Sequence, residues 1–327
     1  MYVEPDVVFT CVPPESLGYV YPKLVEKGVR FERVLTGYVP NSLPNIKSFK
    51  PIRERQITVG YRGRKLSPAY GILGVLKFNI GPRVKSECIK NDVHCDIEWT
   101  EDKRIYGKNW ISWLETVRAT LVTESGANVF DFDGSIKRGC DYALSNNQKP
   151  SSRVVELIKK RDKEVDMAQI SPRVFEALAH GCALVAYRGN YSKILQPDIH
   201  YICLEKDNSN IASVVKQLKD TLLLERLWKR AYKDLICSGR YTYEIFANRV
   251  RLIINEELLK KDRSVNLDCR SPGILFQSRP EVLTQRKRIY YLTVDDHFYP
   301  VKFVIVKTLK FFKLLNVVNE LKRKLGV

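Results

Sequence analysis

Two aspartates one residue apart, Asp131 and Asp133, lie at the end of an apolar run in the stretch NVFDFDGSI (128–136). Two carboxylates at this spacing could supply a nucleophile and an acid/base for phosphoryl transfer. They could also clamp a divalent metal ion. Because Asp-Gly is a common turn pair, they could instead close a strand at a surface turn. The stretch by itself leaves all three interpretations open.

A second stretch, ISPRVFEALAHGCALVAYRG (170–189), predicts a short helix that leads directly into a buried strand. Ser171 is a good N-cap for that helix. A helix that begins at the carboxyl edge of a parallel sheet presents free backbone N–H groups and a positive dipole end, which together favour phosphate. Arg173 in the first turn would add charge, and Glu176 one turn later could accept hydrogen bonds from a ribose diol.

The elements that must position these residues alternate between strand and helix along the chain, the pattern of an α/β fold with a Rossmann-like parallel sheet. We expect residues 52–259 to form this Rossmann-like domain. The intervals 67–80 and 82–91 read as two separate helices, and the next helix after the strand ATLVTE (119–124) is expected at 151–162. Residues 1–51 hold only enough chain for a remnant of a second domain and a linker.

The stretch 170–189 resembles the donor-binding segment of GT-B glycosyltransferases of the branch called glycosyl transferases group one. The resemblance spans about 55–250 and implies that Glu176 holds the ribose of the donor, while Ser171 and Arg173 lie at its diphosphate. GYRGRKLSPAYG (60–71) matches the place where this family puts a glycine-rich basic turn against the diphosphate. The donor-site candidates in that turn are Arg62, Gly63, Arg64 and Lys65.

What the resemblance implies is a hexosyltransferase-type, metal-independent enzyme of surface polysaccharide synthesis. Its partners would be a nucleotide-diphosphate sugar as co-substrate and a glycan or lipid-linked acceptor, with no cofactor. Two departures qualify this expectation. The second glutamate usual in retaining members falls on Ala168, with Gln169 next to it, and residues 1–51 are too short for a full acceptor domain. A catalytically inactive or truncated glycosyltransferase-like subunit is therefore the alternative, and no catalytic base is assigned.

The phosphohydrolase alternative, of the haloacid-dehalogenase type, would use Asp131 and Asp133 and could draw a magnesium-binding pair from LTVDDHF (292–298). It requires Ser or Thr after the strand CALVAY (182–187), where Arg188 follows. The metal clamp belongs to a different glycosyltransferase architecture. We therefore expect NVFDFDGSI to shape a loop at the sheet edge, with Gly134 making the turn.

Composition sets the remaining limits. The 327 residues carry a formal net charge of +18, which predicts anionic partners, yet no basic–aromatic module indicates nucleic acid. The eight scattered cysteines are expected to be free thiols in a reducing cytoplasm. No apolar run is long enough to span a bilayer. Residues 260–327 form a basic extension, and 301–325 fit an amphipathic helix that could contact an anionic membrane peripherally.

Overall fold

We describe the protein from a computed structural model. It describes residues 5–39, 43–44, 46 and 49–260. The chain divides into two units, Met1–Asp262 and Arg263–Val327. The second unit, the predicted membrane helix at 301–325 and the pair in 292–298 lie outside the described residues. The domain boundaries expected from the sequence stay a prediction.

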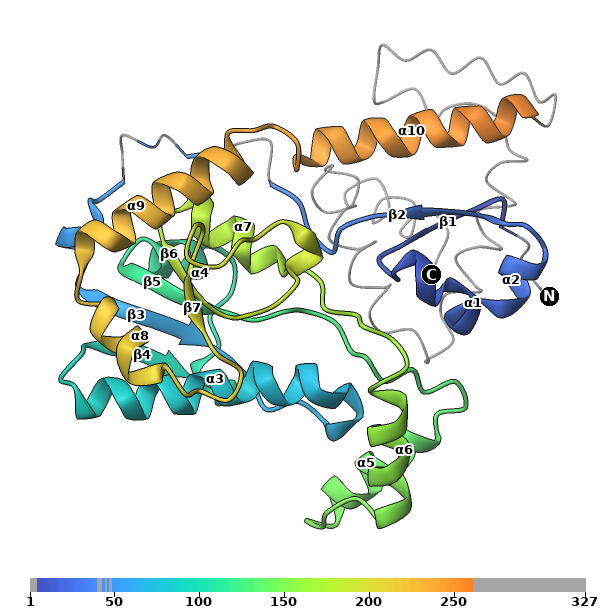
Figure 1. The fold of residues 1–327 in the computed structure, drawn as a ribbon, viewed down its shortest axis with the longest axis horizontal. Coiled ribbons are helices and arrows are strands. Elements are labelled where there is room, and N and C mark those ends of the chain that lie inside the picture. The colour runs from blue at the N-terminus through green and yellow to red at the C-terminus, as the bar shows by residue number, and fades with distance from the viewer. Residues whose placement is uncertain (1–4, 40–42, 45, 47–48, 261–327) are drawn as a thin grey trace, which may run out of the picture. The chain divides into compact units, whose positions relative to one another are not determined.

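The first unit is built on a five-stranded parallel sheet, so the predicted α/β class with a Rossmann-like sheet is confirmed (Figure 1). The strand order is β4-β3-β5-β6-β7 and every pair of neighbours is parallel. In register, Gly60 of β3 pairs with Thr120 of β5 and with Asp96 of β4. The strands are β3 (Ile57–Arg62), β4 (Cys95–Glu98), β5 (Val117–Val122), β6 (Ala183–Tyr187) and β7 (Ile202–Leu204).

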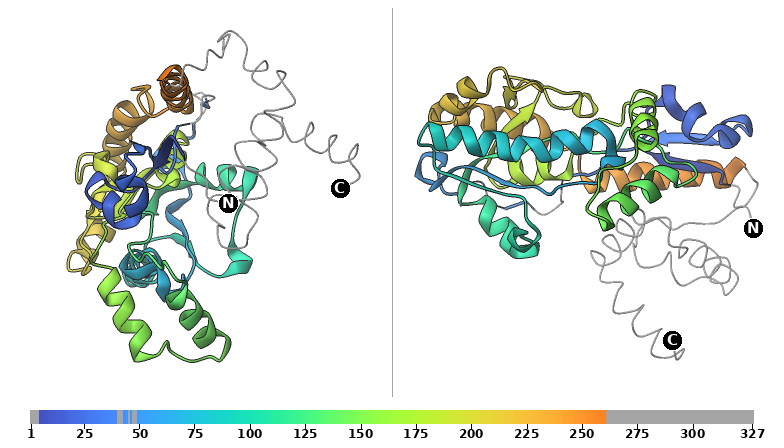
Figure 2. Two further views of the ribbon diagram at one scale, coloured as in Figure 1. Left: turned by 90° about the vertical axis from the view of Figure 1, so that its right-hand side faces the viewer. Right: turned by 90° about the horizontal axis from the view of Figure 1, so that it is seen from below.

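Helices cover both faces of this sheet (Figures 1 and 2). On one side α3 and α8 pack against each other and against the outer strands, and on the other side α7 and α9 pack against β5 and β6. These helices and α4, which packs against β5, are α3 (Gly71–Lys90), α4 (Gly107–Leu114), α7 (Pro172–Ala179), α8 (Ile211–Gln217) and α9 (Thr221–Ala231). A π-helical turn, η7 (Tyr232–Ile236), follows α9.

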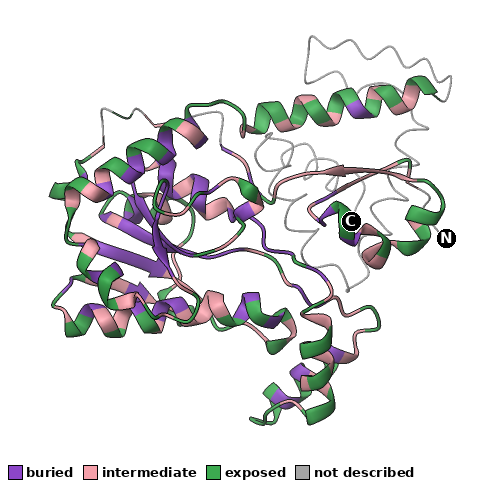
Figure 3. Ribbon diagram, viewed as in Figure 1, coloured by how far each residue is buried: buried purple, intermediate pink, exposed green. Residues whose placement is uncertain are grey.

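The core lies along the central strands, where β6 is buried at every residue (Figure 3). Because helices cover both faces of the sheet, a central strand is apolar along its whole length, and the stretch CALVAY (182–187) has this continuous apolar pattern. A charged residue, Arg55, is also buried here, with 1% of its surface exposed. Its guanidinium donates to the carbonyl oxygens of Leu114 (3.2 Å), Val117 (2.9 Å) and His180 (3.0 Å), so its hydrogen bonds join the start of β5 to the end of α7.

Helix α3 corrects one prediction, because it runs unbroken through Pro82 where two helices were expected. A proline inside a helix removes one backbone hydrogen bond and costs roughly 3 kcal/mol or more. Packing offsets that cost, since four apolar side chains of α3 are fully or almost fully buried: Leu73, Ile80, Val84 and Cys88. The three aliphatic side chains each contribute about 1.5–3 kcal/mol by the usual burial scale. Tertiary packing therefore overrides the local signal.

A helical hairpin follows β5, made of α5 (Ser135–Ser145) and α6 (Ser152–Arg161). Helix α6 matches the expected helix at 151–162, whereas α5 was missed. The two helices share a small apolar core in which Ile136 and Cys140 of α5 meet Val154 and Leu157 of α6. Figure 1 shows the hairpin as a projection beside the sheet.

The N-terminal part of the unit contains a separate two-stranded parallel sheet, β1 (Val7–Thr10) and β2 (Arg30–Arg33), with α1 (Leu17–Val20) and α2 (Pro22–Glu26) between them. The long helix α10 (Tyr243–Lys260) returns to this sheet (Figure 1). Arg30 of β2 pairs with Glu256 at 2.7 Å and Glu257 at 2.9 Å. These contacts tie the last described helix to the first strands.

Two further observations concern the whole described part. No helix in residues 5–39 or 49–260 is long and apolar enough to cross a membrane. The described cysteines are free, and four of them are buried: Cys88, Cys140, Cys182 and Cys203. Burial raises the pKa of Cys88 and of Cys182 to about 12, which makes these thiols unreactive.

Candidate anion-binding site at the carboxyl edge of the sheet

The loop that follows β3 contains the four basic-turn candidates. The Arg62 side chain is paired inside the protein, whereas those of Arg64 and Lys65 are exposed. The Arg62 guanidinium points to the neighbouring strand, where Nη2 lies 2.7 Å from Asp96 Oδ2 and the group stacks on Trp113 at 4.7 Å. Trp113 also donates to Asp96 at 2.6 Å. Burial alone would raise the pKa of Asp96, but these two hydrogen bonds outweigh it and lower the pKa. The charge of Arg62 is thus compensated inside the protein.

Arg64 and Lys65 are exposed, and among the described residues no carboxylate pairs with either. They line a concave region of about 390 Å³ together with Tyr70, Trp99 and Glu101, whose carboxylate is paired with Arg104 at 2.6 Å. Gly63 lies between Arg62 and Arg64, and a Cβ there would come within 2.7 Å of the Tyr61 ring. The backbone of the turn therefore approaches the sheet closely, while its last two cations face outward.

Helix α7 meets this loop from the other side of the sheet edge. Ser171 takes the N-cap position, as predicted, but its side chain makes no capping hydrogen bond to any described residue. Arg173 donates through Nη1 to the backbone oxygen of Arg62 and stacks over the Trp110 ring at 5.3 Å. Trp110 Nε1 in turn donates to Glu176 Oε2 at 2.9 Å. Four predicted residues, Arg62, Ser171, Arg173 and Glu176, are thereby brought to one place.

Lys77 on α3 joins this group, although the sequence interpretation missed it. Its pKa is lowered to about 8, first by burial and then by the neighbouring cations Arg173 and Arg64. No carboxylate within the described part of the chain pairs with it. Three cations from α3, α7 and the β3–α3 loop therefore lie near one another, and none of them forms an ion pair with a described carboxylate, which favours an anionic ligand.

The N-termini of two other helices near this edge are already occupied by carboxylates. The Asp162 side chain accepts a hydrogen bond from the backbone N–H of Ile72 at 2.8 Å, so it caps α3. A Cβ on Gly71 would come within 2.4 Å of the same carboxylate. Asp131 accepts from the backbone N–H groups of Ile136 (3.2 Å) and Lys137 (2.7 Å), so it caps α5. A phosphate cannot take either place without displacing a carboxylate.

The DFD stretch is therefore a helix-capping loop. Asp133 accepts from the Ser135 N–H at 3.0 Å, and Gly134 makes the expected turn, with φ +72° in the left-handed region. Both aspartates have backbone N–H groups as partners. No cluster of three or more His, Cys, Asp or Glu side chains that could hold a metal ion occurs among the residues described. The phosphohydrolase interpretation gains no support from this geometry.

Sequence reasoning also missed a strained turn beside α7. Tyr191, Ser192 and Lys193 have φ values of +44°, +56° and +61°, a conformation that costs non-glycine residues about 1–3 kcal/mol each. The buried carboxylate of Glu124, just after β5, accepts from the N–H of Tyr191 at 3.3 Å and from Lys206 at 3.2 Å. Ser192 accepts from the Ile170 N–H at 3.0 Å, immediately before α7. The turn therefore supports the start of α7.

Ala168 occupies the position at which retaining GT-B glycosyltransferases carry a second glutamate, and its surroundings are apolar. Ala168 lies in a small cluster with Val12, Leu73, Val165 and Met167. Gln169 is 1% exposed and accepts a hydrogen bond from Ser192 at 3.0 Å. No carboxylate stands there.

No protein-family profile and no curated protein matches the chain. Among solved structures it is similar to the crystal structure of TarM, with a TM-score of 0.41 and 12% sequence identity. The similarity covers 77% of this chain and 44% of TarM, so the chain spans less than half the length of that protein. Similarity this distant supports no statement about activity.

Proposed function

We propose that the protein is a glycosyltransferase that binds a nucleotide-diphosphate sugar at the carboxyl edge of the sheet. The sugar would pass to a glycan or lipid-linked acceptor of surface polysaccharide synthesis. The observation that carries this proposal is the convergence of the cations Arg64, Lys77 and Arg173 beside the anchored carboxylate of Glu176. A diphosphate and a ribose are the two chemical groups that match these two features.

The diphosphate would lie between the β3–α3 loop and the N-terminus of α7. Backbone N–H groups at a helix start bind phosphate, and the N-termini of α3 and α5 are occupied by Asp162 and Asp131. At α7 the side chain of Ser171 is buried and makes no capping bond. Lys65 and the Gly63 backbone border the same loop. Preorganised cations placed here would stabilise the charge on the departing diphosphate without a metal ion.

Glu176 would orient the ribose by accepting hydrogen bonds from its hydroxyls. The Trp110 indole holds one carboxylate oxygen at 2.9 Å, which fixes the orientation of the group and leaves lone pairs for a ligand. Arg173 stacks on the same indole. The ribose and phosphate contacts are therefore mechanically linked through Trp110.

A catalytically inactive relative remains the alternative, because no catalytic base is assigned and Ala168 stands where retaining enzymes carry glutamate. An inactive relative would bind nucleotide but not cleave the donor. Release of nucleoside diphosphate from a nucleotide sugar by the wild-type protein separates the two cases.

The proposal is tested by a thermal-shift panel of UDP, GDP, ADP and inorganic pyrophosphate. We expect at least one nucleotide to stabilise the wild type. Glu176→Gln should weaken nucleotide binding about tenfold, because a charge-assisted hydrogen bond of about 1.5–3 kcal/mol is replaced by a neutral one of about 0.5–1.5 kcal/mol. Pyrophosphate binding should be unchanged, because it has no ribose. The matched control is Glu156→Gln, at an exposed position on α6. Absence of any nucleotide-induced shift in the wild type would overturn the proposal.

A further inference from the structure

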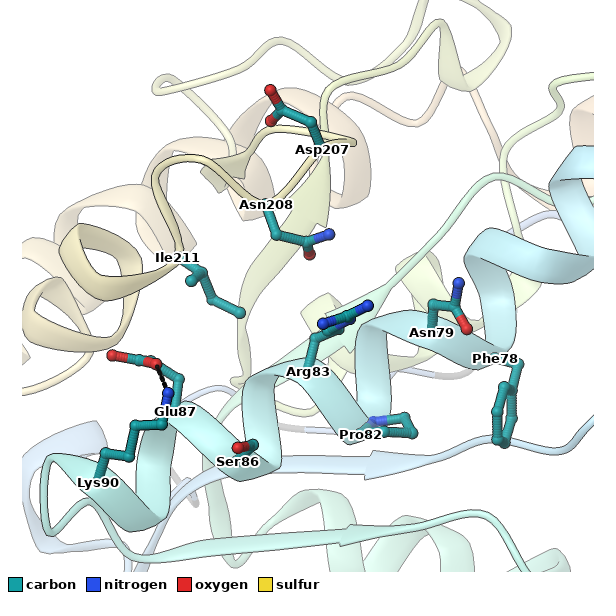
Figure 4. A pocket seen from close by; sticks show the side chains of 10 residues that line it. All are labelled: Phe78, Asn79, Pro82, Arg83, Ser86, Glu87, Lys90, Asp207, Asn208 and Ile211. Atoms are coloured by element: carbon teal, nitrogen blue, oxygen red, sulfur yellow. Dashed lines mark hydrogen bonds and ion pairs between the residues drawn. The ribbon is translucent and has the colours of Figure 1, made fainter.

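A groove of about 600 Å³ lies between α3 and the loop that joins β7 to α8 (Figure 4). Its polar lining comes from the helix and from the loop: Asn79, Arg83, Ser86, Glu87 and Lys90 on α3, and Asp207 and Asn208 on the loop. Figure 4 shows Arg83 and Asn79 rising from the helix toward the loop that carries Asn208. Its volume is within the range of about 300–1,000 Å³ common for small-molecule sites.

This groove is a different site from the cationic edge, although α3 serves both. Arg83 follows Lys77 by about 1.7 helical turns, so the two side chains leave the helix in directions about 120° apart. Within the described residues, the lining of the groove includes none of the proposed donor residues. A ligand in the groove would therefore not compete directly with a nucleotide.

The charges of the groove are balanced. Its lining contains two cations, Arg83 and Lys90, and two acids, Glu87 and Asp207. Lys90 is paired with Glu87 at 3.3 Å. The Arg83 guanidinium has no ion-pair partner in the described part of the chain and remains available as a planar set of hydrogen-bond donors. A phosphate or other strongly anionic ligand gains no net attraction here.

The loop that closes the groove is held in one conformation before any ligand arrives. Asn208 adopts φ +65° and accepts a hydrogen bond from the Tyr187 hydroxyl at 3.0 Å, which fixes its amide. Asp207 accepts from the Ser209 N–H at 2.9 Å. Asn210 accepts from the Glu205 N–H at 2.9 Å and donates to the Cys203 oxygen at 2.8 Å. A preformed loop loses little conformational entropy when it binds.

We infer that this groove binds a neutral oligosaccharide. Sugar hydroxyls need both donors and acceptors, and Arg83, Asn79, Asn208, Ser86 and Asp207 supply both. Pro82 and Ile211 add apolar surface that can cover the C–H faces of a sugar ring. The assignment of that oligosaccharide as a remote part of the acceptor rests on the proposed function. Glycan binding itself does not. A second contact of this kind raises the effective concentration of a polymeric acceptor at the enzyme.

The test uses an array of immobilised neutral and acidic oligosaccharides, probed with the labelled full-length chain. We expect the wild type to bind neutral members. Arg83→Ala, which removes the free donor, and Ser86→Trp, which fills the groove from an exposed position, should each lower that binding at least fivefold. Arg153→Ala on α6 is the matched control, because Arg153 is exposed like Arg83 and has no ion-pair partner among the described residues. It should leave binding unchanged.

The inference is overturned if no neutral member binds the wild type more strongly than the two groove variants, or if only acidic members bind. The same variants are also carried through the nucleotide thermal-shift panel, where they should behave as wild type. Nucleotide binding without glycan binding defeats this inference alone. Glycan binding without nucleotide binding defeats the proposed function and leaves the groove assignment standing.

Discussion

The carboxyl edge of the sheet and the groove beside α8 share one helix, α3, but their charges differ. At the edge, Arg64, Lys77 and Arg173 converge with no carboxylate paired to them in the described chain. The groove is lined by two cations and two acids, and one cation, Lys90, forms an ion pair with Glu87. The edge is therefore suited to a diphosphate and the groove to a neutral ligand. Charge compensation, more than the number of basic residues, distinguishes the two regions.

The largest expected effect on nucleotide affinity comes from reversing the charge of a cation at the carboxyl edge of the sheet. In Arg173→Glu a carboxylate replaces the cation at the start of α7, and nucleoside diphosphate affinity should fall more than about a hundredfold, or roughly 3 kcal/mol. Arg64→Glu, at an exposed position, should give a smaller loss in the same direction. Isothermal titration calorimetry measures both.

The matched control for that experiment lies in the groove. Arg83→Glu should change nucleotide affinity less than about threefold, because the groove charge acts at longer range and is screened by salt. Equal losses in the Arg173 and Arg83 variants would mean that overall charge, and not a local site, governs binding.

The protonation of Lys77 should make nucleotide binding depend on pH. The pKa of Lys77 is lowered to about 8, so the free site loses its third charge as the pH rises above that value. A bound diphosphate favours the ammonium and raises its pKa, so binding takes up a proton and is tightest below pH 8. From pH 7 to pH 9 we expect affinity to fall about tenfold, the loss for one pH unit above the pKa of a required proton.

Substitution of this lysine should remove the pH effect. Lys77→Met should bind more weakly at pH 7 and show little change up to pH 9. Lys85→Met, whose wild-type side chain is paired with Glu98 at 2.7 Å, should keep the wild-type slope. A slope that survives in Lys77→Met would assign the titration to another group.

The smallest expected effect is on stability, and it comes from the loop in which Asp131 caps α5. Asp131→Ala removes the acceptor for two backbone N–H groups of α5 and should lower the free energy of unfolding by about 1 kcal/mol, measured by urea denaturation. Nucleotide affinity should not change. Asp141→Ala, which breaks only an exposed pair with Lys137, should cost less than about 0.5 kcal/mol. Loss of a magnesium-dependent phosphatase activity in Asp131→Ala would instead revive the phosphohydrolase interpretation.

The strands and α7 could be predicted because their signals are local. A buried parallel strand such as β6 is a continuous apolar run, and the Ser-Pro start of α7 is a well-known helix signal. Helix α5 also had a local signal, since Ile136, Cys140 and Ala143 are spaced as one helical face and are all buried. Its polar composition and the preceding Asp-Gly turn hid that signal.

The features of the site that could not be predicted from the sequence depend on contacts between distant segments of the chain. In sequence Arg62, Arg64 and Lys65 look alike, and only the neighbouring strand, through Asp96, shows that Arg62 is neutralised. Lys77 looks like an ordinary helix lysine until α7 brings Arg173 near it. The continuity of α3 through Pro82 depends likewise on what its buried face packs against.

The central claim is that a nucleoside diphosphate binds where the β3–α3 loop meets α7. Hydrogen–deuterium exchange with saturating UDP, GDP or ADP, whichever shifts the melting temperature most, tests it directly. We predict protection in peptides that cover residues 60–70 and 170–178, with no change at 128–146 or 205–211. Protection confined to 128–146 or to 205–211, or no protection anywhere, would contradict the account.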